Sequence, residues 1–276
     1  MKNVNGIVVI IVLYKTKPSD SSSLNQYLSY NHVLKVPKQL IIYNNSGDFD
    51  ISEPKNCIII NSENNDMLAK PFNFAYEYAK NINYDWVLLI DADTNITKEY
   101  FEELNQFVKP GISENIASIV PQLFQNNKSI SPHINKLFYT IRRPLKKNGF
   151  NSGNITAFNS LSMLRVSFID AINGFNENYP LDMLDYWIYN QIFRLKKAIY
   201  ILDCKIEHDL SVNDYDNKMS VERYINLIHA EDIFFKNAGC FNYLLFKIRL
   251  LYRAIKQRIS LQNKRFSQIT FKHIFR

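Results

Sequence analysis

Short apolar runs alternate with amphipathic segments along the first two thirds of the chain. Four runs rich in β-branched and aromatic residues predict strands at 6–14, 39–43, 56–61 and 85–90. Pro71 suits the first turn of a helix that ends near Lys80, and Thr97 begins a second helix that extends to Phe107. Strands that alternate with helices predict an α/β fold, with a mostly parallel sheet and helices on both faces.

The second half of the chain has a less regular pattern. Further strands are expected at 117–121 and 198–202, and the apolar pattern resumes at 159–166. Residues 122–160 are polar, which predicts a functional loop or short hairpins. Helices are expected at 182–195, from Ser220 to about Lys236, and at 241–259.

Composition narrows the class of protein. The chain has 276 residues, of which 46% are hydrophobic, so a sizeable core can form. Cys57, Cys204 and Cys240 lack metal-type spacing, and an odd number of isolated cysteines fits a reducing compartment. The apolar run 7–13 is too short to span a bilayer and no cleavage site follows it, so we expect a cytoplasmic protein.

The net charge of +7 comes from the C-terminal end of the chain. Residues 241–276 carry nine Lys and Arg and no acid, whereas residues 1–240 are slightly acidic. An apolar stripe runs through 241–259 between these basic residues. The segment is therefore either a helix on the inner face of an anionic membrane or a helix packed on the main domain. No nucleic-acid-binding module accompanies the charge, so no nucleic-acid partner is expected.

Two acids, Asp91 and Asp93, end the apolar run 86–90. Open α/β sheets bind ligands beyond the carboxyl ends of their strands, and two carboxylates there can hold a divalent cation together with phosphates. A polar turn after a strand is the alternative, because two acids in this spacing are common.

Several segments, in order, resemble the inverting family 2 glycosyltransferases with the GT-A fold. They are 10–14, Asn44-Asn45-Ser46, 65–73, Asp91-Ala92-Asp93, 173–187 and 206–211. The resemblance runs from about Ile7 to Phe235 and is strongest to the rhamnosyltransferase-like branch of bacterial surface polysaccharide synthesis. It implies a GT-A catalytic domain at 1–215, with a nucleotide-sugar half at about 1–95 and an acceptor half at about 96–215. A basic helical extension would follow at 216–276.

The resemblance implies three nucleotide-binding residues besides the two acids. Tyr14, Asn44 and Asn73 would border it, although Asn44 stands where the family usually has aspartate. The amide oxygen of Asn44 can still accept from uracil or thymine, without charge assistance. A simple turn is the alternative for Asn44, and packing within a helix is the alternative for Asn73. The family tends to have glycine where Met67 stands.

The same resemblance implies a metal and a base. Asp93, with Asp91 and His208, would hold Mn²⁺ or Mg²⁺ and the diphosphate. Asp185 would be the catalytic base, or an acid stabilised by the start of its helix. Asp182 would be the helix N-cap or an acceptor contact.

The resemblance also gives an acceptor or sugar pocket. It would include Ser160, Ser162 and Trp187, although a tryptophan on a helix is usually part of the core.

Together these features predict transfer of a sugar from a UDP- or dTDP-linked donor to a hydroxyl of a glycan or lipid-linked glycan. A nucleotidyltransferase is a second hypothesis, although the segment after Tyr14 has no glycine-rich phosphate loop. A non-catalytic membrane-associated scaffold is the third. The oligomeric state stays open, a homo-oligomer included.

Overall fold

The structure is a computed structural model that describes residues 5–52, 54–108, 112–136, 139, 141–145, 147–208, 215 and 219–275. It divides into two compact units. Unit 1 comprises Met1–Ile134 and Pro144–His208, and unit 2 comprises Asn135–Arg143 and Asp209–Arg276. The predicted functional division at residue 215 stays a prediction.

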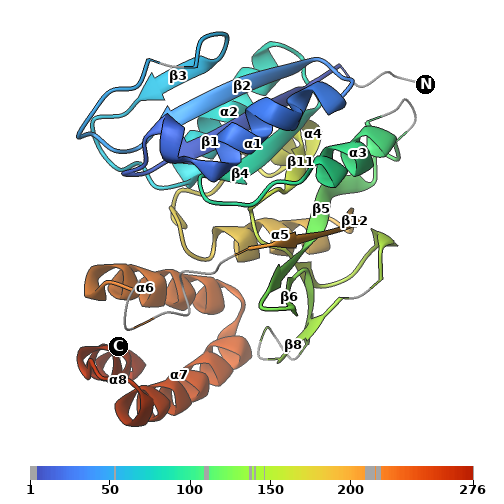
Figure 1. Ribbon diagram of the computed structural model, residues 1–276. Helices are drawn as coiled ribbons and strands as arrows, with labels where there is room; N and C mark the ends of the chain where they lie inside the picture. The colour runs from blue at the N-terminus through green and yellow to red at the C-terminus, as the bar shows by residue number, and fades with distance from the viewer. Residues whose placement is uncertain are drawn as a thin grey trace. The chain divides into compact units, whose positions relative to one another are not determined.

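A large, mostly parallel sheet forms the centre of unit 1 (Figure 1). In the described part of the chain it has nine strands, in the order β3-β2-β1-β4-β11-β5-β12-β9, with β6 beside β5. Their bounds are β1 Ile7–Leu13, β2 Lys38–Asn44, β3 Ile58–Asn61, β4 Trp86–Asp91, β5 Ile116–Gln125, β6 Lys128–Ser131, β9 Gly149–Asn151, β11 Met163–Arg165 and β12 Ala198–Glu207. The strand β11 is antiparallel to both of its neighbours, and β6 and β9 are antiparallel edge pairings. This is the arrangement expected of the GT-A fold.

The central strands are buried on both faces. Every residue of β1 is at most 6% exposed, and Trp86 to Ile90 of β4 are at most 1% exposed. Continuous apolar runs of this kind are typical of parallel strands covered by helices on both sides. The helices of unit 1 are α1 Ser22–Tyr30, α2 Ala69–Asn81, α3 Lys98–Phe107, α4 Val166–Ala171 and α5 Leu184–Arg194.

Two helices pack on one face of the sheet and share its main core. Leu24 of α1 and Tyr100 of α3 lie in one buried cluster with Val9, Ile11 and other alternate residues of the strands. The helix α2 packs against β1 and β4 from the opposite side, as Figure 1 shows. Two 3₁₀ turns, Pro18–Asp20 and Asn31–Val33, flank α1.

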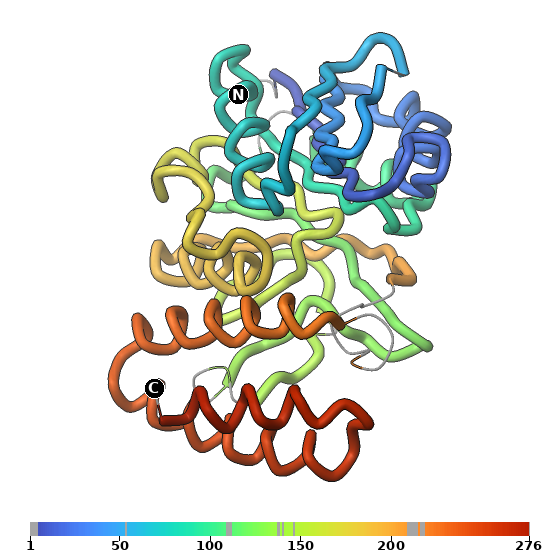
Figure 2. Tube along the Cα trace, turned by 90° about the vertical axis from the view of Figure 1, so that its left-hand side faces the viewer, coloured from blue at the N-terminus to red at the C-terminus, as the bar shows by residue number. Residues whose placement is uncertain are grey.

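Unit 2 is helical in its C-terminal part, with α6 Val221–Asn237, α7 Cys240–Ser260 and α8 Arg265–Ile274. Figure 2 shows these three helices following one another along the trace. The Ser220 hydroxyl caps α6 by accepting from the backbone N of Arg223 at 3.1 Å. Gly239, with φ +103°, joins α6 to α7 in a conformation that favours glycine.

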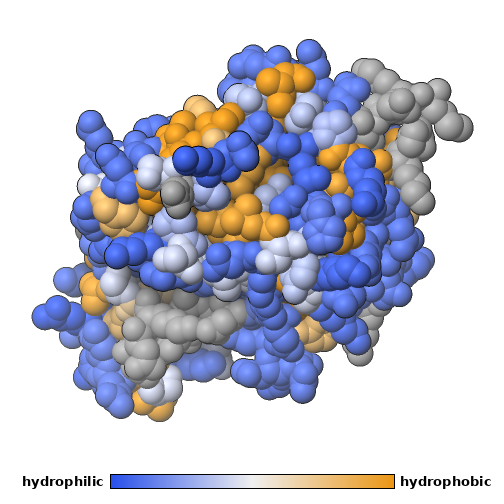
Figure 3. Space-filling view, turned by 45° about the horizontal axis from the view of Figure 1, so that its top comes forward, coloured by the Kyte–Doolittle hydropathy of each residue, from blue (hydrophilic) through white to orange (hydrophobic). Residues whose placement is uncertain are grey.

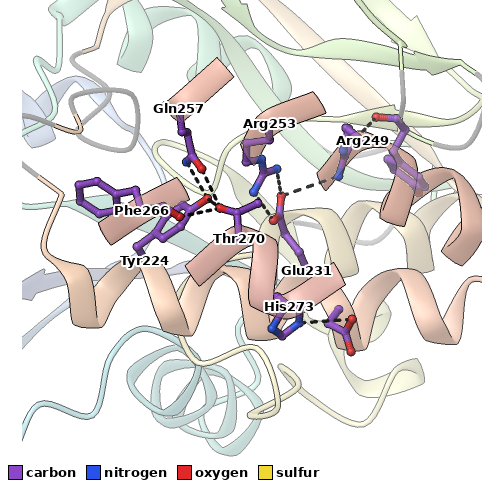
Figure 4. Close-up of polar contacts among 10 residues, drawn as sticks. Tyr224, Glu231, Arg249, Arg253, Gln257, Phe266, Thr270 and His273 are labelled. Carbon is purple, nitrogen blue, oxygen red and sulfur yellow. Dashed lines mark hydrogen bonds and ion pairs between the residues drawn. The ribbon is translucent and has the colours of Figure 1, made fainter. Parts of the chain in front are cut away.

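A polar network fixes the three helices of unit 2 to one another (Figure 4). The hydroxyls of Tyr224 and Thr270 are 2.6 Å apart, and the Gln257 amide donates to Tyr224 and accepts from Thr270, each at 2.7 Å. All three residues are buried. Buried polar groups that satisfy one another in this way select one packing of the helices.

Most predicted strands and helices are confirmed, but several elements were missed. The helix α1 has few apolar positions, and α4 is only six residues long. The helix α8 follows the last predicted helix and was also not expected. Residues 122–160, predicted as a loop or hairpins, contain β6, β9 and the short strands β7 His133–Lys136, β8 Ile141–Pro144 and β10 Ile155–Thr156.

The N-cap prediction for Asp182 is wrong. The helix α5 begins at Leu184, and its N-cap is Met183, which has φ +67° and forms no side-chain cap. Because Met183 turns the chain into the left-handed region, the helix starts later than its apolar pattern suggests.

The face drawn in Figure 3 has hydrophilic residues over much of its area, with apolar patches among them. Within the described residues, no helix combines the length and the apolar character that crossing a bilayer requires.

Candidate active site

The carboxyl ends of three neighbouring parallel strands lie at one edge of the sheet in unit 1. The register pairs Leu13 with Asn44 and Val12 with Asp91. Tyr14, Asn44 and Asp91 therefore begin from the same edge, where ligands of open α/β sheets bind. Strand pairing alone brings these three predicted residues together.

Two serines at the start of α1 hold the turn that carries the acids. The Ser21 hydroxyl donates to Ala92 O at 2.8 Å, and the Ser23 hydroxyl lies 2.5 Å from Asp91 O and 2.8 Å from Thr94 O. Both serines are fully buried. Neither serine stands out in the sequence as a site residue, although Ser21 before Leu24 is a helix N-cap signal that marks the start of α1.

Asp91 lies among groups that come from three parts of the chain. The pKa of Asp91 is raised to about 6, chiefly by burial and also by the charge of Asp93, whereas His208 and a hydrogen bond from Ser160 act to lower it. Ser160 is also hydrogen-bonded to Thr94, and both residues are buried. The predicted residues 91, 93, 160 and 208 therefore share one electrostatic neighbourhood.

His208 follows the end of β12. Its backbone N donates to Phe124 O at 2.8 Å, which continues the pairing of β12 with β5. Its Nδ1 is buried and has no hydrogen-bond partner among the described residues. An unsatisfied imidazole nitrogen near two carboxylates is suited to a ligand that the protein itself does not supply.

The side chains of Asp91, Asp93 and His208 have the chemistry to bind a hard divalent cation. Carboxylate oxygens suit Mg²⁺ and Mn²⁺, and an imidazole nitrogen is acceptable to Mn²⁺. Within the described ranges, however, no three His, Cys, Asp or Glu side chains are already arranged to hold a metal ion. Oxygen atoms of a substrate would have to complete the coordination, and the metal stays a prediction.

A turn at residues 159–162 connects the acids to α5. The Ser162 hydroxyl donates to Phe158 O at 2.6 Å and lies 2.9 Å from the Tyr189 hydroxyl, which is 3.0 Å from that of Ser118. The pKa of Tyr189 is raised to about 12, chiefly by burial and to a smaller extent by the charge of Asp185, one helical turn earlier. The predicted base thus lies near Tyr189, a residue that no sequence motif marks as part of the site.

The helix α5 and the turn before it carry the three remaining acceptor-side predictions. Asp185 is half-buried at the second helical position, and its Oδ1 accepts from the backbone N of Tyr186 at 2.8 Å. Asp182 precedes the helix and is also half-buried. The ring of Trp187 lies 6.5 Å from that of Tyr179, so part of its surface packs within the protein.

Asn44 is fully buried, and its side chain shapes the loop that follows β2. Its Nδ2 donates to Phe49 O at 2.6 Å and to Asn61 Oδ1 at 3.1 Å, and its Oδ1 accepts from Ser46 N at 3.1 Å. These hydrogen bonds fit the alternative of a simple turn, because the amide oxygen that would face the base already accepts from Ser46 N. Tyr14, in contrast, is 46% exposed.

Asn73 connects α2 to the turn at residues 174–177. Its Nδ2 donates to Phe175 O at 2.9 Å and to Glu177 Oε1 at 3.2 Å, and its Oδ1 accepts from Phe175 N at 2.7 Å. A Cβ added to Gly174, which has φ +83°, would lie 2.7 Å from Asn73 Oδ1. Asn73 therefore positions the segment that leads to α5.

Four non-glycine residues beside predicted site residues have a left-handed backbone. They are Lys15, Met67, Leu161 and Met183, with φ between +52° and +67°. Such conformations cost on the order of 1–3 kcal/mol each and cluster at functional sites. Met67, at a position where the family tends to have glycine, thus has a backbone conformation that favours glycine.

A comparison with protein-family models bears directly on this site. Residues 46–172 match the model described as glycosyl transferase family 2. Over this segment the sequence is similar to family 2 glycosyltransferases. The matched segment includes Asn73, the two acids of the β4 turn, Ser160 and Ser162.

The fold of the chain also matches a solved structure. The crystal structure of S. aureus TarS, residues 1–349, aligns with a TM-score of 0.50 and 13% sequence identity, and the alignment covers 97% of this chain and 82% of that one. At this identity the likeness shows the fold alone. The comparison with curated protein sequences finds no match.

Proposed function

We propose that the chain is an inverting glycosyltransferase that moves a sugar from a nucleoside diphosphate donor to a hydroxyl of a glycan or lipid-linked glycan. The observation that carries the proposal is the neighbourhood of Asp91, Asp93, Ser160 and His208 at the carboxyl edge of the sheet, in a chain whose residues 46–172 are similar to family 2 glycosyltransferases. The resemblance of the sequence to the rhamnosyltransferase-like branch supports a UDP- or dTDP-linked hexose or deoxyhexose. It also supports a place in bacterial surface polysaccharide synthesis.

Asp93, together with Asp91 and His208, would hold Mn²⁺ or Mg²⁺. The ion, when bound, neutralises the charge that develops on the leaving diphosphate. The buried Nδ1 of His208, without a hydrogen-bond partner among the described residues, and the raised pKa of Asp91 support this assignment. Tyr14, exposed at the end of β1, is the candidate to contact the base, whereas Asn44 and Asn73 support the nucleotide through the backbone segments that they hold.

Asp185 would take the proton from the acceptor hydroxyl as that oxygen attacks the anomeric carbon. One in-line displacement forms the new C–O bond as the bond to the diphosphate breaks, so the anomeric carbon inverts and no covalent enzyme intermediate is needed. Ser160 and Ser162 would contact the sugar, and Trp187 and Asp182 the acceptor. The location of Asp185 near Tyr189, whose hydroxyl lies 2.9 Å from that of Ser162, supports these roles.

A transfer assay with a panel of UDP- and dTDP-sugars tests the proposal. We expect Asp185→Asn to lower kcat by 10²-fold or more, roughly the range of general base catalysis, with an unchanged affinity for UDP. The control is Asp170→Asn, because Asp170 is an exposed acid of unit 1 whose ion pair with Lys80 is also exposed and contributes little.

Chelation provides the second arm of the assay. EDTA should abolish transfer, and added Mn²⁺ should restore it. Full transfer by Asp185→Asn would remove the base assignment, and transfer indifferent to EDTA would remove the metal. Pyrophosphate release from a nucleoside triphosphate would instead indicate a nucleotidyltransferase.

A further inference from the structure

One face of α7 consists of large apolar side chains that are exposed. Its seven members are 44–79% exposed: Phe241, Leu244, Ile248, Leu251, Tyr252, Ile255 and Ile259. At 3.6 residues per turn, these positions fall within an arc of about 100°. We call this arc the apolar face of α7. The buried residues Phe246, Leu250, Ala254 and Gln257 lie on the opposite side of the helix.

The basic residues of α7 divide into two groups according to this face. Lys247, Arg249 and Arg253 point to α6, where Arg253 donates to both oxygens of Glu231 at 2.6 and 2.7 Å and Lys247 donates to Asp232 at 3.1 Å. Lys256 and Arg258 are exposed, and no ion pair joins either of them to an acid in the described part of the chain. At the same helical spacing, they lie about 40° and 20° outside the two edges of the apolar face.

The helix α8 extends the apolar face sideways. A groove of about 380 Å³ runs between the two helices and is lined by Leu251, Ile255 and Ile259 of α7 and by Phe271 of α8, with Arg258 at its margin. Phe271 and Phe275 are 51% and 77% exposed, and their rings are 5.3 Å apart. Lys272, next to Phe271, is also exposed.

We propose that the apolar face of α7, with Phe271 and Phe275 of α8, binds the surface of an anionic phospholipid bilayer. Apolar side chains flanked on both edges by unpaired cations are the arrangement of helices that lie in the interface of a membrane. The cations then reach the phosphate groups while the apolar side chains enter the acyl boundary.

Charge argues for this partner over two others. Residues 241–276 contain no acid, so two copies placed face to face would bring like charges together without a counter-charge. A nucleic acid would attract the cations but would offer nothing for seven large apolar side chains to pack against. The proposal does not depend on the transferase assignment.

Sedimentation of the full chain with vesicles tests the proposal. The vesicles are made of phosphatidylcholine alone or of phosphatidylcholine with phosphatidylglycerol, at low and at high salt. The first variant, Ile248→Glu/Ile255→Glu, changes two exposed positions of the apolar face, and the second, Lys256→Gln/Arg258→Gln, removes the flanking charges. The control is Leu28→Glu, since Leu28 is a similarly exposed leucine of α1 in unit 1. Circular dichroism checks that each variant keeps its helices.

We expect binding to the phosphatidylglycerol vesicles that weakens at high salt. The charge variant should lower the partition coefficient about 30-fold, at about fivefold for each charge. The apolar-face variant should abolish binding, and the control should bind like the wild type. Failure to bind anionic vesicles, or equal binding by the apolar-face variant and the control, would overturn the proposal. A dimer in solution that the apolar-face variant dissociates would also overturn it, by assigning the face to a second copy.

Discussion

Glu231 is the residue whose replacement tests the packing of unit 2 most sharply. It is 6% exposed, and its two carboxylate oxygens accept from Arg253 at 2.6 and 2.7 Å, with Arg249 at 3.7 Å (Figure 4). Glu231→Gln preserves the shape of the side chain but leaves two guanidinium groups without their carboxylate. Removal of one member of a buried pair costs about 3–5 kcal/mol. Because the side chains of Arg253 and Arg249 are 22% and 21% exposed, water compensates part of this cost, and we expect about 2–3 kcal/mol.

Hydrogen exchange of the full chain measures this loss where it occurs. Both tryptophans, Trp86 and Trp187, belong to unit 1, so tryptophan fluorescence does not report on unit 2. In peptides from α6, α7 and α8, the loss corresponds to exchange about 30- to 150-fold faster than in the wild type. The control is Glu222→Gln, which changes an exposed acid in the first turn of the same helix. Equal exchange in the two variants would refute the assigned contribution of the ion pair.

The same residue gives a pH dependence with a definite sign. Burial by itself raises the pKa of Glu231, but the charges of Arg253 and Arg249 and the hydrogen bonds from Arg253 outweigh it, so the pKa lies below its ordinary value of 4.5. The stabilisation is therefore fully present above pH 4.5 and is lost as the pH falls through the lower, folded pKa. Urea unfolding followed by circular dichroism should show wild type and Glu231→Gln converging at acid pH. A gap that widened on acidification would contradict this reasoning.

Two further substitutions test the supports of the candidate site. Ser23→Ala should lower the free energy of unfolding in urea by about 1–3 kcal/mol, because Asp91 O and Thr94 O lose their buried partner, and it should raise the KM for the donor. Ser22→Ala, at an exposed position, should change neither quantity. Gly174→Ala should lower the free energy of unfolding by about 2–4 kcal/mol, since the new Cβ meets Asn73 Oδ1 at 2.7 Å in a backbone with φ +83°. Gly153→Ala, with φ +122° and no atom within 4 Å, should lower it only by the backbone strain of about 1–2 kcal/mol.

The sequence predicts the sheet well because burial of both faces leaves a clear pattern. The runs that form β1 and β4 are uninterrupted apolar segments, as expected of parallel strands between two layers of helices. The helix α1 is not predicted from the sequence because it contributes few side chains to the core. It buries Ser23, Leu24 and Tyr27, and a stripe with one serine in it does not stand out in a polar segment.

The candidate site is likewise predictable from the sequence only in part. Acids at the end of an apolar strand are visible in the sequence, because strand ends and ligand sites coincide in this type of fold. The serine hydroxyls that hold the turn of these acids bind its backbone carbonyls, and no sequence pattern reveals them. Ser21 and Ser23 bind carbonyl oxygens of the turn about 70 residues away in the chain, and no spacing rule connects two such segments. The location of Tyr189 beside Ser162 depends equally on tertiary packing.

The basic C-terminal segment shows why a count of charges underdetermines function. Nine cations with no acid describe both a helix packed on acidic neighbours and a helix on an anionic surface. The structure contains both cases on α7 itself: Arg253 and Lys247 neutralise acids of α6, whereas Lys256 and Arg258 flank exposed apolar residues. Cations that neutralise buried carboxylates are needed for the fold and are poor candidates for binding a partner. The relevant charge for binding is therefore the smaller set beside the apolar face, and this set should determine the salt dependence of any membrane association.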